Sequence, residues 1–256
     1  MKPLLLEVRQ LSKSYQRAQG VFGHKKVQAL SHVSFTLEAG QTLAIVGETG
    51  SGKSTLAKLL IGIESPDQGE ILLEGQAIQI TDFKDYNQVI RYIFQDPARS
   101  LNPHQKIGQM LQDVLRYSSS LPAEEHQAKI RLTLRQVGLM DEHADYYPHM
   151  FSGGQLQRVA LARALILDPK LLILDEALTA MDPSLRAQIV NLLLELQKQQ
   201  GLAYLLITNH LRLVRHIADK MLVLHQGNAL DYGDTAAVFA DPQFDYSKKL
   251  ISSAMS

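Results

Sequence analysis

A glycine-rich turn between a buried strand and a helix constrains this chain more than any other feature of its sequence. Residues 41–46 form a short apolar run that predicts a buried strand, and leucines at helical spacing begin at Leu56. The turn between them fits the pattern G-x-x-x-x-G-K-[ST]. Its residues are Gly47, Glu48, Thr49, Gly50, Ser51, Gly52, Lys53, Ser54 and Thr55.

Such a turn is suited to holding phosphate. Its glycines let backbone N–H groups point at phosphate oxygens, and the helix that follows adds its positive end. Lys53 is then placed to reach the β- and γ-phosphates, and Ser54 to offer its hydroxyl to Mg²⁺. The alternative is an ordinary glycine-rich turn with an incidental lysine. The position between a strand and a helix favours nucleotide binding.

The rest of the chain alternates between buried runs and helical patterns. Residues 171–174, 203–208 and 221–224 predict buried strands, and apolar residues in 189–196 follow helical spacing. Strands that alternate with helices predict an α/β fold with a parallel sheet. Right-handed crossovers would bring the loops after these strands to one edge, where ligands bind in such sheets.

The first eighty residues predict an antiparallel β part. Val33, Phe35 and Leu37 alternate with polar neighbours, and Gly75 interrupts apolar runs within residues 70–80, which indicates a hairpin. The helix after the glycine-rich turn is expected to stop before Pro66 and Gly69. Its apolar face is predicted to contain Leu56, Leu59, Leu60 and Ile63.

We expect a single domain over residues 1–256. Residues 1–95 and 169–240 would form the α/β core. Residues 96–168 are polar, helical in pattern and interrupted by prolines, which indicates an inserted helical subdomain. Residues 241–256 would form a short C-terminal tail.

Composition excludes several classes of protein. The 26 Lys and Arg residues balance 26 Asp and Glu residues, so the basic excess typical of a general nucleic-acid binder is missing. The absence of cysteine excludes disulfides, thiolate metal sites and a catalytic cysteine. No apolar run approaches the length of a membrane span, and the apolar run in residues 1–7 is too short for a signal peptide. If the protein works at a membrane, another chain must cross it.

The apolar run at residues 171–174 ends in two acids, Asp175 and Glu176. At the edge of a parallel sheet, Asp175 is placed to hold Mg²⁺ through water. Glu176 is then placed to accept a proton from an attacking water molecule. Many core strands end in an acid, so this interpretation depends on the glycine-rich turn.

A second anion site is suggested by Ser152, Gly153, Gly154 and Gln155, which come directly before a helical pattern. Ser152 would cap that helix, and the two glycines would expose backbone N–H groups at its positive end. Without other motifs, an ordinary helix cap is the simpler interpretation.

Taken together, these motifs resemble the ATP-binding subunits of ABC transporters, over nearly the whole chain. The order is the same: glycine-rich turn, Gln95, Ser152 to Gln155, the acidic pair, then Asp182 in a further acidic turn. The resemblance implies the fold of the P-loop NTPases, with RecA-like topology, ATP hydrolysis with Mg²⁺, and two subunits facing head to tail. The Ser-Gly-Gly-Gln segment of one subunit would close on the γ-phosphate held by the other.

The resemblance also implies roles for single residues. Tyr15 would stack on adenine, although a half-buried strand aromatic is the simpler interpretation. Gln95 would sense Mg²⁺ and the attacking water, so Ser54, Gln95 and Asp175 form the expected metal set. Asp182 would communicate across the dimer.

Residues 94–103, Phe-Gln-Asp-Pro-Ala-Arg-Ser-Leu-Asn-Pro, resemble a segment typical of oligopeptide and dipeptide transporter ATPases, and residues 241–250 a worn form of that group's tail motif. This implies a peptide importer on the cytoplasmic face of the bacterial inner membrane. The expected partners are a second ATPase subunit, identical or different, membrane permease subunits, and indirectly a binding protein. The helical middle would dock on the permease, with Leu101 and Met110 as positions to test.

One departure from the family pattern follows the strand at residues 203–208. Relatives carry a histidine there, but this chain has Asn209 at that position and His210 one residue later. Either His210 reaches the γ-phosphate or the subunit's own site is weak; His210 as an ordinary surface residue is a third possibility.

The competing functions are a weakly hydrolysing regulatory subunit, favoured only by Asn209, and an importer of another small solute such as nickel. A soluble ABC protein acting on DNA or ribosomes would carry two cassettes or long coiled coils, and an adenylate-type kinase would leave residues 152–155 unexplained.

Overall fold

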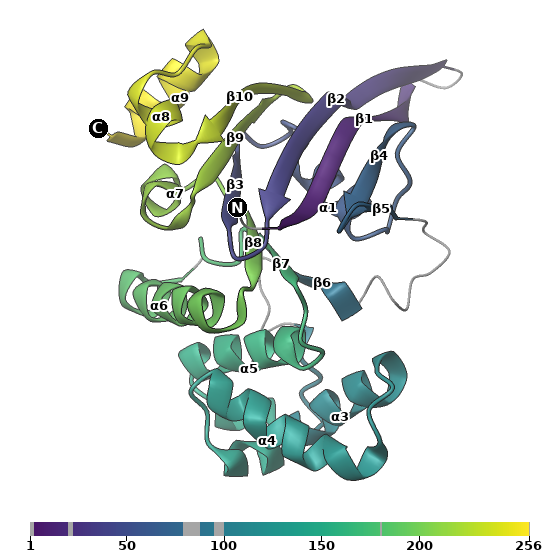
Figure 1. Ribbon diagram of the computed structural model, residues 1–256, viewed down its shortest axis with the longest axis vertical. Coiled ribbons are helices and arrows are strands. Elements are labelled where there is room, and N and C mark those ends of the chain that lie inside the picture. The colour runs from purple at the N-terminus through teal and green to yellow at the C-terminus, as the bar shows by residue number, and fades with distance from the viewer. Residues whose placement is uncertain (1–2, 20–22, 79–87, 95–99, 180, 256) are drawn as a thin grey trace. The chain divides into compact units, whose positions relative to one another are not determined.

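The computed structural model describes residues 3–19, 23–78, 88–94, 100–179 and 181–255. The chain divides into two compact units, residues 1–82 with 203–256, and residues 83–202 (Figure 1). Strands and helices alternate along most of the chain, which confirms the predicted α/β class.

The first unit contains an antiparallel sheet in the order β2-β1-β4-β5. Its strands are β1 (Leu4–Gln19), β2 (Gly23–Glu38), β4 (Gln68–Leu73) and β5 (Gln76–Ala77). Val33, Phe35 and Leu37 of β2 are buried, as their alternation predicts. The predicted hairpin joins β4 to β5 through Glu74 and Gly75, whose φ values of 51° and 81° suit a tight hairpin turn.

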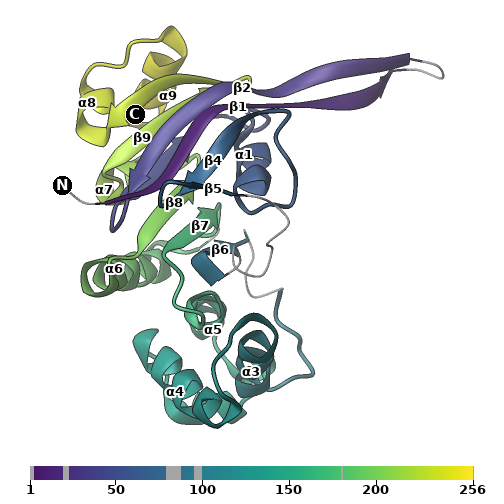
Figure 2. The same cartoon turned by 45° about the vertical axis from the view of Figure 1, so that its right-hand side comes forward.

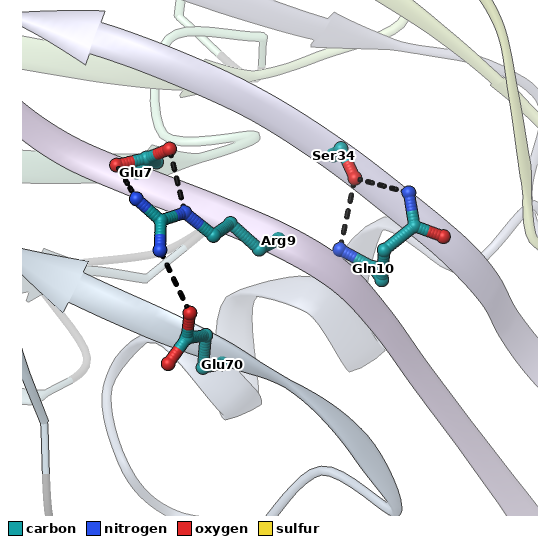
Figure 3. Close-up of polar contacts among 5 residues, drawn as sticks. All are labelled: Glu7, Arg9, Gln10, Ser34 and Glu70. Atoms are coloured by element: carbon teal, nitrogen blue, oxygen red, sulfur yellow. Dashed lines mark hydrogen bonds and ion pairs between the residues drawn. The ribbon is translucent and has the colours of Figure 1, made fainter.

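A bulge in β1 centres on Gln10, which has a φ of 50° and lies where the β1–β2 register shifts between Val8 and Leu11. The Gln10 backbone N–H donates to Ser34 Oγ at 2.8 Å (Figure 3). Beside it, Arg9 bridges Glu7 and Glu70 at 2.7 and 2.9 Å. These side chains are solvent-exposed enough that the ion pairs add little stability, whereas the bulge sets which residues face the core.

The first unit also contains a second group of strands. β3 (Thr42–Val46) runs parallel to β8 (Ala203–Ile207) on one side and to β9 (Lys220–His225) on the other, and β10 (Asn228–Asp234) is antiparallel to β9. All residues of β3 and β8 are buried, as their apolar runs predict. The helices of this unit are α1 (Lys53–Leu60), α7 (Leu211–Ile217), α8 (Thr235–Ala240) and α9 (Asp245–Met255). Helix α8 contacts β10, and Figure 2 shows α9 beside α8.

Helix α1 ends earlier than its apolar spacing predicts. Gly62 adopts a φ of 70°, and the N–H of Ile63 bonds back to Lys58 O at 3.0 Å, which closes the helix. Ile63 is therefore outside the helix and 59% exposed, so its predicted place on the buried face is wrong. The left-handed glycine stops the helix before Pro66 and Gly69.

The second unit pairs β6 (Ile90–Ile93) in parallel with β7 (Leu171–Asp175). Its other elements are α3 (Ile107–Ser118), η3 (Ala123–Glu125), α4 (His126–Gln136), η4 (Asp141–Asp145), η5 (Pro148–Met150), α5 (Gly153–Leu165) and α6 (Pro183–Gln200). Residues 100–168 contain helices and turns but no strand. Leu101 and Met110 are buried there, so neither offers a surface to a docking partner.

Across the described ranges, the helices are all too short or too polar to cross a membrane.

Candidate nucleotide-binding site

The glycine-rich turn joins β3 to α1, and two of its glycines are required by close packing. A Cβ on Gly47 would lie 2.1 Å from the carbonyl oxygen of Leu224 in β9. A Cβ on Gly52 would lie 2.6 Å from the carbonyl oxygen of Ala29, and Gly52 has a φ of 111°. Only glycine fits both positions, so the neighbouring strands fix the path of the turn.

Lys53 is folded back over the start of the turn. Its Nζ donates to the carbonyl oxygens of Gly47 and Glu48 at 2.6 and 2.8 Å, and the residue is only 8% exposed. A buried ammonium needs such acceptors. The positive charge is thereby held at the turn, where it can meet an incoming anion.

The remaining turn residues form an open cradle. Glu48, Thr49, Gly50 and Ser54 are exposed. Gly52 provides no side-chain cap to α1, so the first N–H groups of that helix are not satisfied by a capping side chain. This arrangement suits a phosphate group at the helix end.

Two hydroxyl residues of the turn differ from Ser54 in burial. Ser51 is buried, and its hydroxyl has no hydrogen-bond partner within the described part of the chain. Thr55 is half-buried in the first turn of α1.

His210 caps α7. Its ring Nδ1 accepts a hydrogen bond from the Leu213 backbone N–H at 3.1 Å. The backbone N–H of His210 donates to Thr208 Oγ1, also at 3.1 Å. Because Nδ1 accepts, the neutral ring carries its proton on Nε2. The ring is half-buried, whereas Asn209 beside it is exposed. His210 therefore has both a structural role and a donor nitrogen.

Tyr15 lies half-buried on β1, and its hydroxyl donates to the Glu64 carboxylate. Burial, followed by the hydrogen bond to Glu64, raises the pKa of Tyr15, so the phenol stays neutral. Lys13 Nζ lies 5.8 Å from the ring centroid. The ring is thus fixed in orientation, which suits either stacking or packing.

In the second unit, the acids at the end of β7 are held by specific partners. The Tyr92 hydroxyl from β6 donates to Asp175 Oδ2. Burial and the neighbouring carboxylate raise the pKa of Tyr92, so the phenol remains a donor. A hydrogen bond of this kind orients a carboxylate for a metal ion. No sequence motif marks Tyr92, although its place on β6, the strand beside residues 171–175, brings it within reach of Asp175.

Glu176 has an unusual backbone. Its φ of 52° is rare for a residue with a side chain and marks a constrained position. Its Oε2 accepts from Thr179 Oγ1 at 2.6 Å, and its carbonyl accepts from the Thr179 N–H at 3.1 Å. The carboxylate is therefore held in one orientation at the strand end.

Ser152 begins α5 with a capping box. Its Oγ accepts from the Gln155 N–H at 3.3 Å, and its N–H donates to Gln155 Oε1 at 3.0 Å. A Cβ on Gly154 would lie 2.9 Å from Leu185, but a Cβ on Gly153 would meet no atom within 4 Å. Gly154 thus faces the movable end of the Leu185 side chain, and Gly153 faces open space.

Asp182 caps α6 by accepting from the Leu185 N–H at 2.9 Å. This is a sufficient structural reason for an acid at that position. Gln95 lies outside the described residues.

The oxygen donors present fit a magnesium ion. Mg²⁺ is usually bound by one or two carboxylates together with substrate phosphates. Ser54 and Asp175 provide a hydroxyl and an oriented carboxylate. No cluster of three or more acidic or histidine residues able to hold a metal occurs in the part of the chain described. Each of these two oxygen donors is of a kind that Mg²⁺ binds, Ser54 in the first unit and Asp175 in the second.

Comparison with known proteins adds an independent line of evidence. Residues 30–179 match the family model described as ABC transporter. The chain is 49% identical to the putrescine export system ATP-binding protein SapF of Escherichia coli K12, over 97% of this chain and 92% of that protein. It is 48% identical to the peptide transport system ATP-binding protein SapF of Salmonella typhimurium, over 98% and 94%.

A dipeptide transport ATP-binding protein, DppF of Escherichia coli K12, is 44% identical over 97% of this chain and 75% of its own length. Among solved structures, cbiO1 from Clostridium perfringens, part of the transporter complex cbiONQ, has a TM-score of 0.80. It is 29% identical over 94% of this chain and 92% of that protein.

Proposed function

The chain belongs to the ABC transporter family, and we propose that it is the ATP-hydrolysing subunit of a peptide importer. The observation that carries this proposal is the phosphate turn, with Lys53 held over the carbonyl groups of Gly47 and Glu48. A nucleotide phosphate would replace these carbonyls as the partner of the ammonium group. The residues proposed to bind ATP are those of the turn, residues 47–55, together with Tyr15, which would stack on the adenine base.

Magnesium would be held by Ser54 and Asp175, with Gln95 completing the proposed set. When bound, Mg²⁺ neutralises charge on the phosphate oxygens. The Tyr92 hydroxyl keeps Asp175 oriented for this role.

Glu176 is the proposed general base. Its carboxylate is anchored by Thr179, and one hydrogen bond leaves it further acceptor capacity for a water proton. The strained backbone fits a residue whose orientation matters for function.

His210 is the proposed donor to the γ-phosphate. The cap contact to Leu213 places the ring proton on Nε2, which can donate a hydrogen bond as charge develops on the phosphate oxygens. His210 would thus take the role of the histidine that relatives carry at the position of Asn209.

Residues 152–155 are proposed to close on nucleotide held by a second ATPase subunit. The open space at Gly153 supports this, since no atom of the described residues lies within 4 Å of a Cβ placed there. Asp182 would contribute to communication across the same dimer while it caps α6.

The peptide assignment rests on relatives that differ in their names. SapF of Salmonella typhimurium and DppF are named for peptides, and SapF of Escherichia coli K12 is named for putrescine export. We place the chain on the cytoplasmic face of a bacterial membrane, bound to permease subunits. A binding protein would deliver the substrate to those subunits. Uptake of labelled peptide and export of labelled putrescine, in cells with and without the gene, distinguish the two substrates.

A weakly hydrolysing regulatory subunit is the second candidate, and Asn209 is the observation that favours it. ATPase activity of the chain alone and with its partner subunit separates the two candidates. Hydrolysis by the chain alone supports the motor, whereas hydrolysis that depends entirely on the partner's site supports the regulator.

Nucleotide binding itself is tested with Lys53→Ala. The variant loses the charge that offsets the phosphates, so calorimetry should detect no ATP binding under conditions in which the natural chain binds. Equal Mg-ATP affinity in both proteins would contradict the assignment of the turn.

A further inference from the structure

The C-terminal helix touches the phosphate turn through one side chain. Tyr246, in the first turn of α9, accepts a hydrogen bond from the Glu48 N–H at 3.0 Å, although 198 residues separate them. Its ring stacks on His225, the last residue of β9, with centroids 3.8 Å apart and planes at 27°. Neither residue is among those that the sequence predicts to bind nucleotide.

This contact completes the support of the Glu48 backbone. The Glu48 carbonyl oxygen accepts from Lys53 Nζ at 2.8 Å and from the Ser51 N–H at 3.1 Å. Its N–H is bonded to Tyr246 on the other side. Both backbone polar groups of Glu48 are thus held, one from within the turn and one from the tail.

The tail that carries Tyr246 is firmly docked on its own unit. The Gln243 N–H donates to Asp231 Oδ1 of β10 at 3.0 Å. Ser247 is fully buried and Ile251 is 7% exposed. The Tyr246 hydroxyl therefore approaches the turn from a fixed support.

We propose that Tyr246 is a positioning residue for the nucleotide, through which α9 holds the first part of the phosphate turn in its receiving conformation. The proposal rests on the proposed function, namely that this turn binds ATP. When Lys53 leaves the Gly47 and Glu48 carbonyls for a phosphate, the Tyr246 contact remains. A turn that populates its binding conformation less often binds more weakly in proportion.

Tyr246→Phe tests this directly, because it removes the hydroxyl and keeps the ring on His225. Tyr232→Phe is the matched control: the Tyr232 hydroxyl also bonds a backbone group, Thr36, in the same unit, but far along the chain from the turn. We expect roughly 3- to 10-fold weaker ATP and ADP binding by calorimetry for Tyr246→Phe, the loss of about one hydrogen bond. Tyr232→Phe should bind as the natural chain does.

Hydrogen exchange separates positioning from simple packing. Without nucleotide, residues 44–52 should exchange faster in Tyr246→Phe than in Tyr232→Phe, and saturating ATP should restore protection. His225→Ala should weaken binding through loss of the stack. Combined with Tyr246→Phe it should add little, since both changes act on one hydrogen bond.

Unchanged affinity and exchange in Tyr246→Phe would overturn the proposal, whatever happens to thermal stability. Lys53→Ala, measured in parallel, keeps the two ideas apart. If Lys53→Ala abolishes binding while Tyr246→Phe is silent, the positioning role alone fails. If Lys53→Ala binds normally, the nucleotide assignment fails and the Tyr246 proposal fails with it.

Discussion

At the scale of single residues, Glu176 combines a rare backbone conformation with an anchored carboxylate. Glu176→Gln is nearly isosteric, but the amide cannot accept a proton. We expect ATP affinity to be retained and hydrolysis to fall by about 10²–10⁴-fold. Phosphate release and calorimetry measure the two quantities, with the exposed Glu142→Gln as control. Full turnover in Glu176→Gln would mean that another residue is the base.

His210 raises a second question at this scale, because it caps α7 and is also the proposed phosphate donor. His210→Ala removes both roles, and loss of a cap alone costs about 0.5–2 kcal/mol. His210→Asn keeps a good cap and lacks the ring N–H. We therefore expect both variants to lose most ATPase activity, with only His210→Ala losing stability, and Asn209→Ala to lose little.

Measurements on the assembled transporter can contradict the role proposed for His210. If the partner's site carries turnover, His210→Asn, Asn209→Ala and Glu176→Gln should all be nearly silent there. An essential Asn209 with a dispensable His210 would instead show that the amide makes the contact. ATPase rates of the three variants in the complex decide between these cases.

At the scale of elements, local patterns predict the strand, turn and helix around Lys53 because their signals lie within a few residues of one another. The end of α1 escapes prediction since Gly62 overrides the apolar spacing that includes Ile63. Contacts between distant segments are beyond such patterns altogether. Tyr92 and Asp175 are 83 residues apart in the sequence, and no local pattern around either residue predicts their hydrogen bond.

The surroundings of the phosphate turn predict different costs of substitution for two of its glycines, Gly50 and Gly52. Gly52→Ala would place a Cβ 2.6 Å from a backbone oxygen, whereas Gly50→Ala would meet no atom within 4 Å. Both have positive φ, which costs a residue with a side chain about 1–2 kcal/mol. We expect Gly50→Ala to lose about that much unfolding free energy and Gly52→Ala clearly more, as measured by urea denaturation. Equal losses would show that the strands around Gly52 yield to the new methyl group.

At the scale of the whole molecule, the family and the α/β fold expected from the sequence are both confirmed, since 49% identity to one relative extends over 97% of the chain. Composition and motif order suffice for that level because they are spread along the chain. The transported substrate is different, because relatives with nearly equal identity to this chain are named for different substrates. The roles proposed for residues 152–155 and Asp182 involve a second subunit, so a dimer is the form of the protein that tests them.

The dimer is tested most directly at Gly153, which faces open space at the start of α5. In Glu176→Gln, ATP should trap a closed dimer that elutes early in size-exclusion chromatography. Adding Gly153→Leu should leave the fold intact, since a Cβ there meets no atom within 4 Å among the described residues and leucine favours helices more than glycine does.

The added leucine should nevertheless prevent the ATP-dependent dimer, because the opposing subunit must approach the bare backbone N–H groups to place its γ-phosphate there. Gly154→Ala in the same background is the contrasting variant, since its Cβ would meet the movable end of the Leu185 side chain at 2.9 Å rather than open space. Far-UV circular dichroism and melting temperature establish which variants remain folded. A folded Gly153→Leu protein that still dimerises with ATP would remove residues 152–155 from the subunit interface and return Ser152 to the simpler role of a helix cap.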